Sequence, residues 1–147
     1  NVIAGSAYLT GTVRTYSDTA HQMMPELIKR IVTHTAMALG AEAELTDYTV
    51  ANLKVENEPA SAQRGRDALV KVLGEQAVGT YRGTLSGEDF SAYLQELPGA
   101  LAFVGCRNPQ IGATFAQHSC FYKVDETVLA RGSMFAAQYA IDFLAEA

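Results

Sequence analysis

The chain has 147 residues, of which 48% are hydrophobic and 18% charged, and its formal net charge is −5 at neutral pH. This composition provides ample material for a packed core and shows no sign of disorder. The acidic balance argues against nucleic acid as a partner, because basic residues occur only singly or in isolated pairs such as Lys29-Arg30. No apolar run approaches the roughly 20 residues that span a bilayer, so we expect no membrane partner.

Two features of the sequence bear on the cellular compartment of the protein and on whether this chain is a fragment. Its two cysteines, Cys106 and Cys120, do not make a disulfide framework, and reduced thiols favour a cytoplasmic location. The sequence begins at Asn1 without a charged or apolar leader and runs directly into a strand-like alternation. That start favours a fragment of a longer chain, although processing would produce it too.

The first fifty residues have the pattern of a strand, a helix and a second strand. Residues 2–16 alternate in polarity as an extended strand does. Ser17 and Asp18 predict a helix start, Pro25 suits the first turn of that helix, and Gly40 predicts its end. Residues 43–50 then fit a second strand. This order predicts a small α/β unit, or half of a ferredoxin-like one.

Residues 51–60 show no periodicity, and we interpret them as a linker between a domain at 1–50 and a domain at 61–147. The second domain reads as alternating helices and strands, which predicts an α/β fold. The expected elements are a helix at 62–73 closed by Gly74, a strand at 77–82, a helix at 88–96, a buried strand at 100–105 and a long packed helix at 126–146.

His118 is the residue best suited to metal chemistry. It lies in a Gly-rich loop after the expected buried strand, where α/β proteins commonly place their sites. The chain has neither His-x-x-x-His nor Cys-x-x-Cys, and a single loop histidine is more often a surface or structural residue. The nearby Cys120 can act as a soft ligand, but a buried, inert thiol is the commoner role.

Three further features are candidates for a binding site. Glu88 and Asp89 begin the expected helix at 88–96, where carboxylates complement the helix dipole and cap free N–H groups, and we weigh this structural role equally with a role in a site. The preceding Ser86-Gly87 would expose backbone N–H groups to a substrate carboxylate. Arg14 is a lone cation on its strand, and a guanidinium suits a carboxylate, although a solvent-facing strand arginine is commonplace.

Taken together, these pieces resemble the zinc-type metallopeptidase and aminoacylase superfamily, in the branch that includes hippurate hydrolase, N-acyl-amino-acid hydrolases and plant auxin-conjugate hydrolases. Their order and spacing match along nearly the whole chain, so the resemblance is more specific than any one motif. The matching stretches are Asn1-Val2-Ile3 with Gly11-Thr12-Val13-Arg14-Thr15, then Gly87-Glu88-Asp89-Phe90-Ser91, then Leu97-Pro98-Gly99-Ala100, and finally His118-Ser119 ahead of Asp125-Glu126.

The resemblance implies a fold and a role for several residues. Residues 1–50 would be the second half of a ferredoxin-like lid and dimerisation domain, and residues 61–147 the C-terminal part of an α/β metallopeptidase catalytic domain. His118 falls on the family's last metal ligand. The lid residues that contact the bound substrate fall on Asn1 and Arg14, and the pocket-lining loop falls on Gly87 and Glu88.

The resemblance also implies a cofactor and partners. The full-length enzyme would hold two divalent metal ions, zinc by analogy, with manganese, cobalt or nickel left open. Its substrate would be an N-acyl amino acid or a similar small amide, and it would be a homodimer. The general base and the other metal ligands would lie in an N-terminal half that is missing here, so no catalytic residue is assigned and the chain alone is expected to be inactive. The alternative is a non-catalytic dimerisation or small-molecule-binding α/β module in which His118 is structural.

Overall fold

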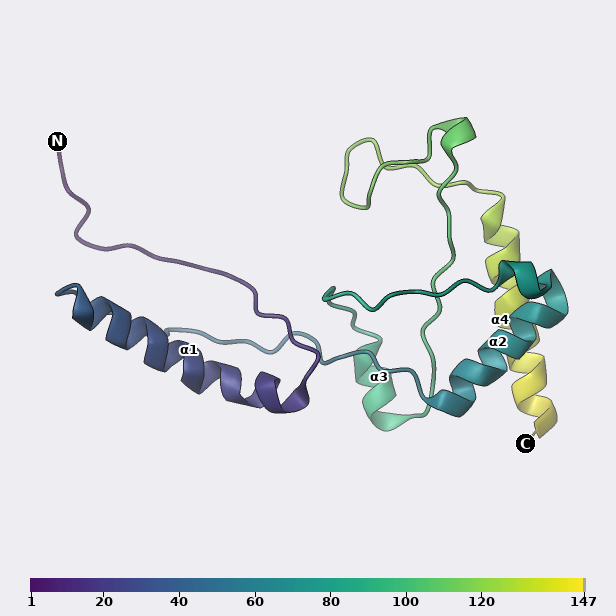
Figure 1. The fold of residues 1–147 in the computed structure, drawn as a ribbon, viewed down its shortest axis with the longest axis horizontal. Coiled ribbons are helices and arrows are strands. Elements are labelled where there is room, and N and C mark those ends of the chain that lie inside the picture. Colours follow the sequence, from purple (N-terminus) through teal and green to yellow (C-terminus); the bar gives the residue numbers. More distant parts are fainter. Residues whose placement is uncertain (147) are drawn as a thin grey trace. The chain divides into compact units, whose positions relative to one another are not determined.

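The computed structural model describes residues 1–146, which divide into two compact units (Figure 1). The first unit comprises Asn1–Lys54 and Thr84–Ser91, and the second comprises Val55–Gly83 and, of the described chain, residues 92–146. The segment that contains Gly87 and Glu88 therefore packs with the first unit, although residues of the second unit precede it in the chain. The domain boundaries expected from the sequence, at 1–50, 51–60 and 61–147, stay predictions.

The first unit contains one long helix, α1 (Asp18–Ala38), whose two ends are determined by local chemistry. The Ser17 hydroxyl accepts a hydrogen bond from the Ala20 N–H at 3.2 Å, which satisfies one of the free donors at the helix start. Gly40 adopts a left-handed φ of 73°, and its N–H donates to the Met37 carbonyl at 3.1 Å. The predicted start and end of this helix are confirmed.

Pro25 lies inside α1, and its predicted place in the first turn is wrong. Proline cannot donate to the carbonyl four residues earlier and usually marks the first turn for that reason. Here the serine hydroxyl of Ser17 provides a stronger start signal further upstream, because it caps the helix directly. The proline is therefore accommodated within the helix, where it leaves the His21 carbonyl without its usual backbone donor.

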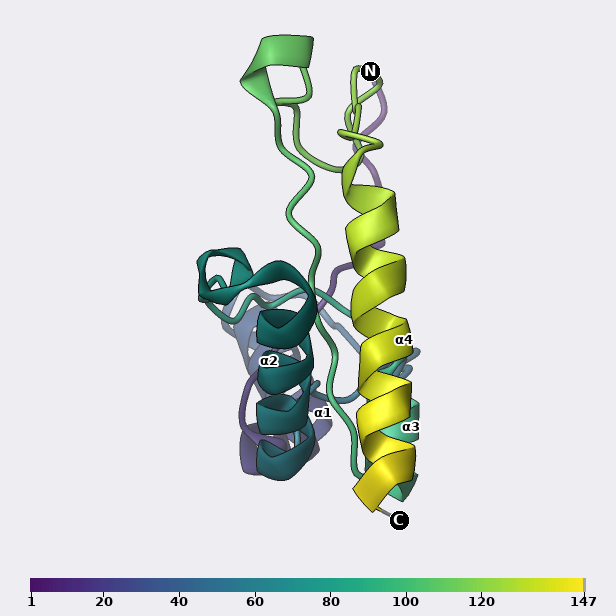
Figure 2. The ribbon, with the colours of Figure 1, turned by 90° about the vertical axis from the view of Figure 1, so that its right-hand side faces the viewer.

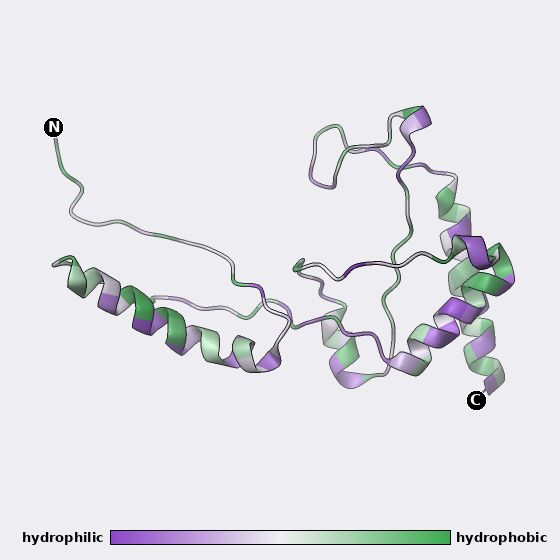
Figure 3. Cartoon of the chain, in the orientation of Figure 1, coloured by the Kyte–Doolittle hydropathy of each residue, from purple (hydrophilic) through white to green (hydrophobic). Residues whose placement is uncertain are grey.

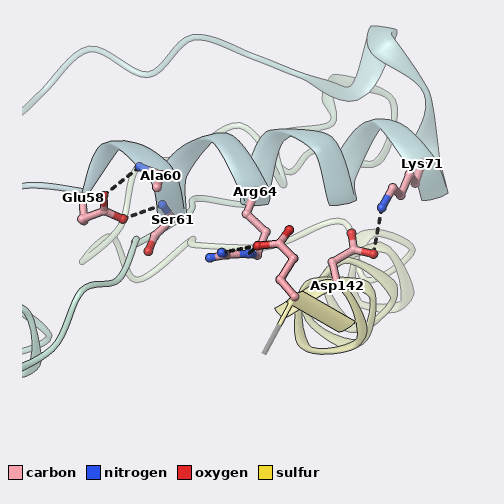
Figure 4. Close-up of polar contacts among 7 residues, drawn as sticks. Glu58, Ala60, Ser61, Arg64, Lys71 and Asp142 are labelled. Atoms are coloured by element: carbon pink, nitrogen blue, oxygen red, sulfur yellow. Dashed lines mark hydrogen bonds and ion pairs between the residues drawn. The ribbon is translucent and has the colours of Figure 1, made fainter. Parts of the chain in front are cut away.

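In the second unit, α2 (Pro59–Leu73) begins at Pro59 and not at the predicted residue 62. Its start is fixed by Glu58, whose two carboxylate oxygens accept the N–H groups of Ala60 at 2.9 Å and Ser61 at 2.6 Å (Figure 4). Glutamate is not among the common N-cap residues, so the sequence pattern did not indicate this cap. The predicted end is confirmed, because Gly74 follows with a φ of 81°.

The Glu58 cap should make the stability of α2 depend on pH. The N–H groups of Ala60 and Ser61 bind the ionised carboxylate and hold the pKa of Glu58 below its usual value. A lowered pKa stabilises the folded state above the ordinary glutamate value of about 4.3, and this contribution disappears as the pH falls through the folded-state pKa. We expect Glu58→Ala to lower the melting temperature at neutral pH. At a pH below the folded-state pKa of Glu58, the substitution should have little effect.

Thermal unfolding followed by circular dichroism over a pH series measures this effect. Glu44→Ala is the matched control, since Glu44 is exposed and caps no helix. A loss in Glu58→Ala that is equal at every pH would contradict an electrostatic cap.

The helices α2 and α4 (Val128–Glu146) lie side by side in the second unit (Figure 2). Two ion pairs join them (Figure 4). Arg64 donates from Nη2 to a carboxylate oxygen of Glu146 at 2.6 Å, and Lys71 Nζ donates to Asp142 Oδ1 at 2.8 Å. The long helix predicted for 126–146 is thus confirmed, with a slightly later start.

The remaining elements of the described chain are short. They are η1 (Glu75–Ala77), α3 (Ser91–Glu96), η2 (Pro109–Ile111) and an isolated antiparallel bridge between Asn108 and Ala113. The segments predicted as strands, 2–16, 43–50, 77–82 and 100–105, form no ladder within residues 1–146. A strand exists only when another strand supplies its hydrogen bonds, so the α/β fold class stays a prediction.

Large apolar side chains remain exposed along the long helices. Figure 3 shows that hydrophobic and hydrophilic residues alternate along these helices. On α4, Ile141 is 61% exposed and Leu144 72% exposed. Phe103, expected in a buried strand, is 57% exposed, although its ring stacks on that of Tyr81 with 4.3 Å between the centroids. Exposed apolar surface of this extent usually marks contact with other protein. In the part of the chain that the structure describes, no helix has the length and apolarity needed to cross a membrane.

Candidate functional site

Arg14 and Gly87, which are distant in sequence, lie together in the first unit. A Cβ atom placed on Gly87 would lie 3.1 Å from Arg14 Nη1 and 3.0 Å from the side-chain nitrogen of Asn52. Both nitrogens belong to N–H donors, and they converge on the backbone at Gly87. Glycine permits this close approach because it has no Cβ to displace them.

The donor groups beside Gly87 are suited to an anion. The Arg14 side chain is exposed, and within residues 1–146 no carboxylate forms an ion pair with it. A guanidinium binds a carboxylate through two parallel N–H bonds, and the Asn52 amide offers a further donor beside it. This arrangement is chemically compatible with the substrate-binding roles predicted for Arg14 and Gly87.

Sequence reasoning missed Asn52, which it placed in the linker at 51–60. One signal was present, because Asn52 closely follows the predicted strand at 43–50, and polar residues after strands often form sites in α/β proteins. Nearby, Lys54 Nζ forms a 3.1 Å ion pair with Asp18 at the start of α1. That pair ties the segment containing Asn52 to the rest of the first unit.

Glu88 lies in the turn that precedes α3 and forms hydrogen bonds with the backbone of that turn. Its Oε1 atom accepts a long hydrogen bond of 3.4 Å from the Phe90 N–H, and its carbonyl accepts one of 3.3 Å from the Ser91 N–H. The side chain is half-buried. The helix predicted for 88–96 begins later, at Ser91, so these contacts stabilise the turn before it, and the pocket role of Glu88 stays a prediction.

Asn1 is exposed, and so are its neighbours Val2 and Ile3, which are 96% and 95% accessible. No hydrogen bond of the described chain links Asn1 to Arg14 or to Gly87. The substrate-binding role predicted for Asn1 therefore depends on the family resemblance alone.

His118 lies in the second unit, in the loop between η2 and α4. Its φ of 67° is in the left-handed region, which residues with a Cβ rarely adopt. The side chain is exposed, and its ring forms no hydrogen bond within the described residues. An exposed imidazole whose ring forms no hydrogen bond has a nitrogen available to coordinate a metal ion.

The single donor His118 does not make a metal-binding site by itself. Residues 1–146 contain no group of three His, Cys, Asp or Glu side chains that could hold a metal ion. His118 therefore fits a single ligand in a site that other groups complete, and it does not fit an independent site. The expectation that Cys120 is buried is wrong. It is exposed because it lies in a surface turn that is closed by the Tyr122 N–H on the Ser119 carbonyl at 3.0 Å.

Comparison with known proteins gives relatives but no family model and no solved structure that matches. The chain is 30% identical to thermostable carboxypeptidase 1 of Saccharolobus solfataricus, over 97% of this chain and 36% of that protein. It is 30% identical to N-acetylcysteine deacetylase of Bacillus subtilis, over 96% of this chain and 35% of that protein. It is 27% identical to an IAA-amino acid hydrolase of Arabidopsis thaliana, over 99% and 34%.

These relatives are, by their names, a carboxypeptidase, a deacetylase and an IAA-amino acid hydrolase. The predicted resemblance is confirmed: over nearly all of its length, the chain is similar to hydrolases of the kinds expected for the metallopeptidase and aminoacylase superfamily. It spans about a third of the length of the curated relatives it matches.

Proposed function

We propose that this chain is part of a metal-dependent amidohydrolase that cleaves the amide bond of N-acyl amino acids or similar small amides. The names of the relatives support the class of reaction, since two of them are named for acylated or conjugated amino acids. The observation that carries the substrate class is the convergence of the Arg14 and Asn52 side-chain nitrogens on Gly87. An N-acyl amino acid has a free carboxylate, which is the group that such donors bind.

In this proposal the first unit positions the substrate. The Arg14 guanidinium would bind the substrate carboxylate in two-point fashion, with Asn52 as an additional donor, and Gly87 would leave room for both. Asn1 and Glu88 would line the same pocket by analogy with the family. Holding the substrate in one orientation lowers the entropic cost of reaching the transition state, so these residues contribute to positioning and not to bond cleavage.

His118 would donate one imidazole nitrogen to a divalent metal, zinc by analogy, with manganese, cobalt or nickel also compatible with a histidine ligand. A bound metal of this kind lowers the pKa of a coordinated water and polarises a carbonyl. The remaining ligands and the general base would come from outside the residues described here, which contain no complete donor group. We therefore propose that this chain is inactive by itself and that the family's homodimer arrangement applies to the whole enzyme.

The test is hydrolysis by the whole protein that carries this chain. N-acetyl amino acids are supplied as substrates, and release of the free amino acid is measured before chelation, after chelation, and after addition of Zn²⁺ or Mn²⁺. We expect activity that chelation removes and metal restores. Absence of hydrolysis together with absence of bound metal would instead favour the non-catalytic binding module.

A further inference from the structure

The segment around His118 is a loop whose two ends meet at one residue, Asn108. The backbone of Asn108 pairs with that of Ala113 through two hydrogen bonds of 2.9 Å, in an isolated antiparallel bridge. The Asn108 side chain donates from Nδ2 to Asp125 Oδ2 at 2.8 Å. We call residues 113–125 the His118 loop. Closed ends of this kind define an Ω-loop, a type of surface loop that often carries function.

The far end of the His118 loop is fixed at Asp125 by further contacts. The Asp125 N–H donates to the Cys106 carbonyl at 3.0 Å. Its Oδ1 atom accepts from both the hydroxyl and the N–H of Thr127, at 2.7 Å and 3.0 Å. Hydrogen bonds from Thr127 and Asn108 lower the pKa of Asp125, so the carboxylate is ionised at neutral pH and its bond with Asn108 is charge-assisted.

Inside the loop, contacts on both sides of His118 hold its backbone. The rings of Phe115 and Phe121 pack with centroids 5.4 Å apart, one before and one after the histidine. The Ser119 N–H donates to the Ala116 carbonyl at 3.3 Å. A residue with a Cβ adopts a left-handed φ only when its surroundings hold it there, and these contacts provide such surroundings.

We propose that Asn108 and Asp125 are positioning residues that hold the His118 imidazole in the orientation in which it binds a metal ion. Neither residue needs to touch the metal, because they act through the closed ends of the His118 loop. A ligand held in place before the metal arrives binds it more tightly than a ligand on a loosely held loop. This inference rests on the proposed function, since it requires that His118 is a metal ligand.

The test uses the whole protein, in its metal-free form, with Asn108→Ala. This change removes the side-chain donor to Asp125 and the Oδ1 acceptor that caps η2 at the Gln110 N–H, and it keeps the backbone bridge to Ala113. Hydrogen–deuterium exchange, read on peptides of the His118 loop, should become faster there and stay unchanged in α1. Zinc affinity, measured by competition with a chelator, should fall about 10–100-fold, as it does when an outer-shell partner of a ligand is lost.

Two further variants control for folding. Asn57→Ala is the matched control, because the Asn57 side chain forms similar bonds to the backbone of Leu101 in the same unit, at 2.8 and 3.0 Å. It should alter neither loop exchange nor zinc affinity. Asp125→Asn is the conservative variant. It keeps an oxygen that can accept from Asn108 and should cause a smaller loss than Asp125→Ala.

The outcomes separate this inference from the proposed function. Faster loop exchange with weaker zinc binding in Asn108→Ala supports the inference. Unchanged exchange, or faster exchange with unchanged zinc affinity, overturns it while leaving the proposed function intact. If His118→Ala binds zinc as tightly as the parent protein, the metal-ligand role itself is wrong, and the positioning role falls with it.

Discussion

Replacing His118 with alanine in the whole protein is expected to remove most of the hydrolytic activity and to weaken metal binding. The loss of metal affinity should exceed the roughly 10–100-fold loss that follows removal of an outer-shell partner of a ligand, because here a direct ligand is deleted. His118 is exposed, and its ring forms no hydrogen bond within residues 1–146, so its loss should leave the second unit folded. Metal content by mass spectrometry and turnover at saturating metal measure the two effects.

Two variants show whether the imidazole itself is responsible. His118→Asn retains a residue that tolerates the left-handed φ of 67° but removes the imidazole, so it should lose activity as His118→Ala does. His34→Ala is the control, because His34 is an exposed histidine of α1 whose Nδ1 lies 2.7 Å from the Arg30 carbonyl. Near-normal turnover of His118→Ala at saturating metal would show that His118 is not a ligand.

Arg14→Ala is expected to raise KM for N-acyl amino acids by about 10–100-fold, the range expected for loss of a hydrogen bond to a charged group. The corresponding methyl esters and amides lack the carboxylate, so their KM should change much less. Arg14→Lys should fall between, since lysine keeps the charge but loses the planar two-point geometry. Steady-state kinetics on matched acid and ester substrates measures the difference.

One control and one further test for Arg14 come from the same unit. Arg30→Ala, the control, removes an exposed cation of α1 and should change the KM of neither the acids nor the esters. Gly87→Ala, the further test, should raise KM for the acids, as Arg14→Ala does. Its new Cβ would lie 3.1 Å from Arg14 Nη1 and would force that side chain to move. Equal effects of Arg14→Ala on acids and esters would mean that Arg14 does not recognise the carboxylate.

The helix ends show how far local sequence can predict structure. Ser17, Gly40 and Gly74 act through bonds and backbone angles within a few residues, and their predicted roles are confirmed. The Glu58 cap is equally local but uses an uncommon residue type, so α2 starts earlier than expected. Pro25 shows the opposite error, in which a typical first-turn residue lies within a helix that a better cap had already started.

By itself, the sequence determined both ends of α1, the C-terminal end of α2 and, through its ordered motifs, the similarity to a superfamily of hydrolases. It also singled out Arg14, Gly87 and His118 as candidate site residues. Only the tertiary structure placed Asn52 beside Arg14 at Gly87, and only it showed that Asn108 closes the His118 loop onto Asp125. These contacts join residues that are not neighbours in the chain. Helix caps and hydrophobic periodicity act over a few residues and contain no information about such pairs, because the path of the folded chain decides which of them meet.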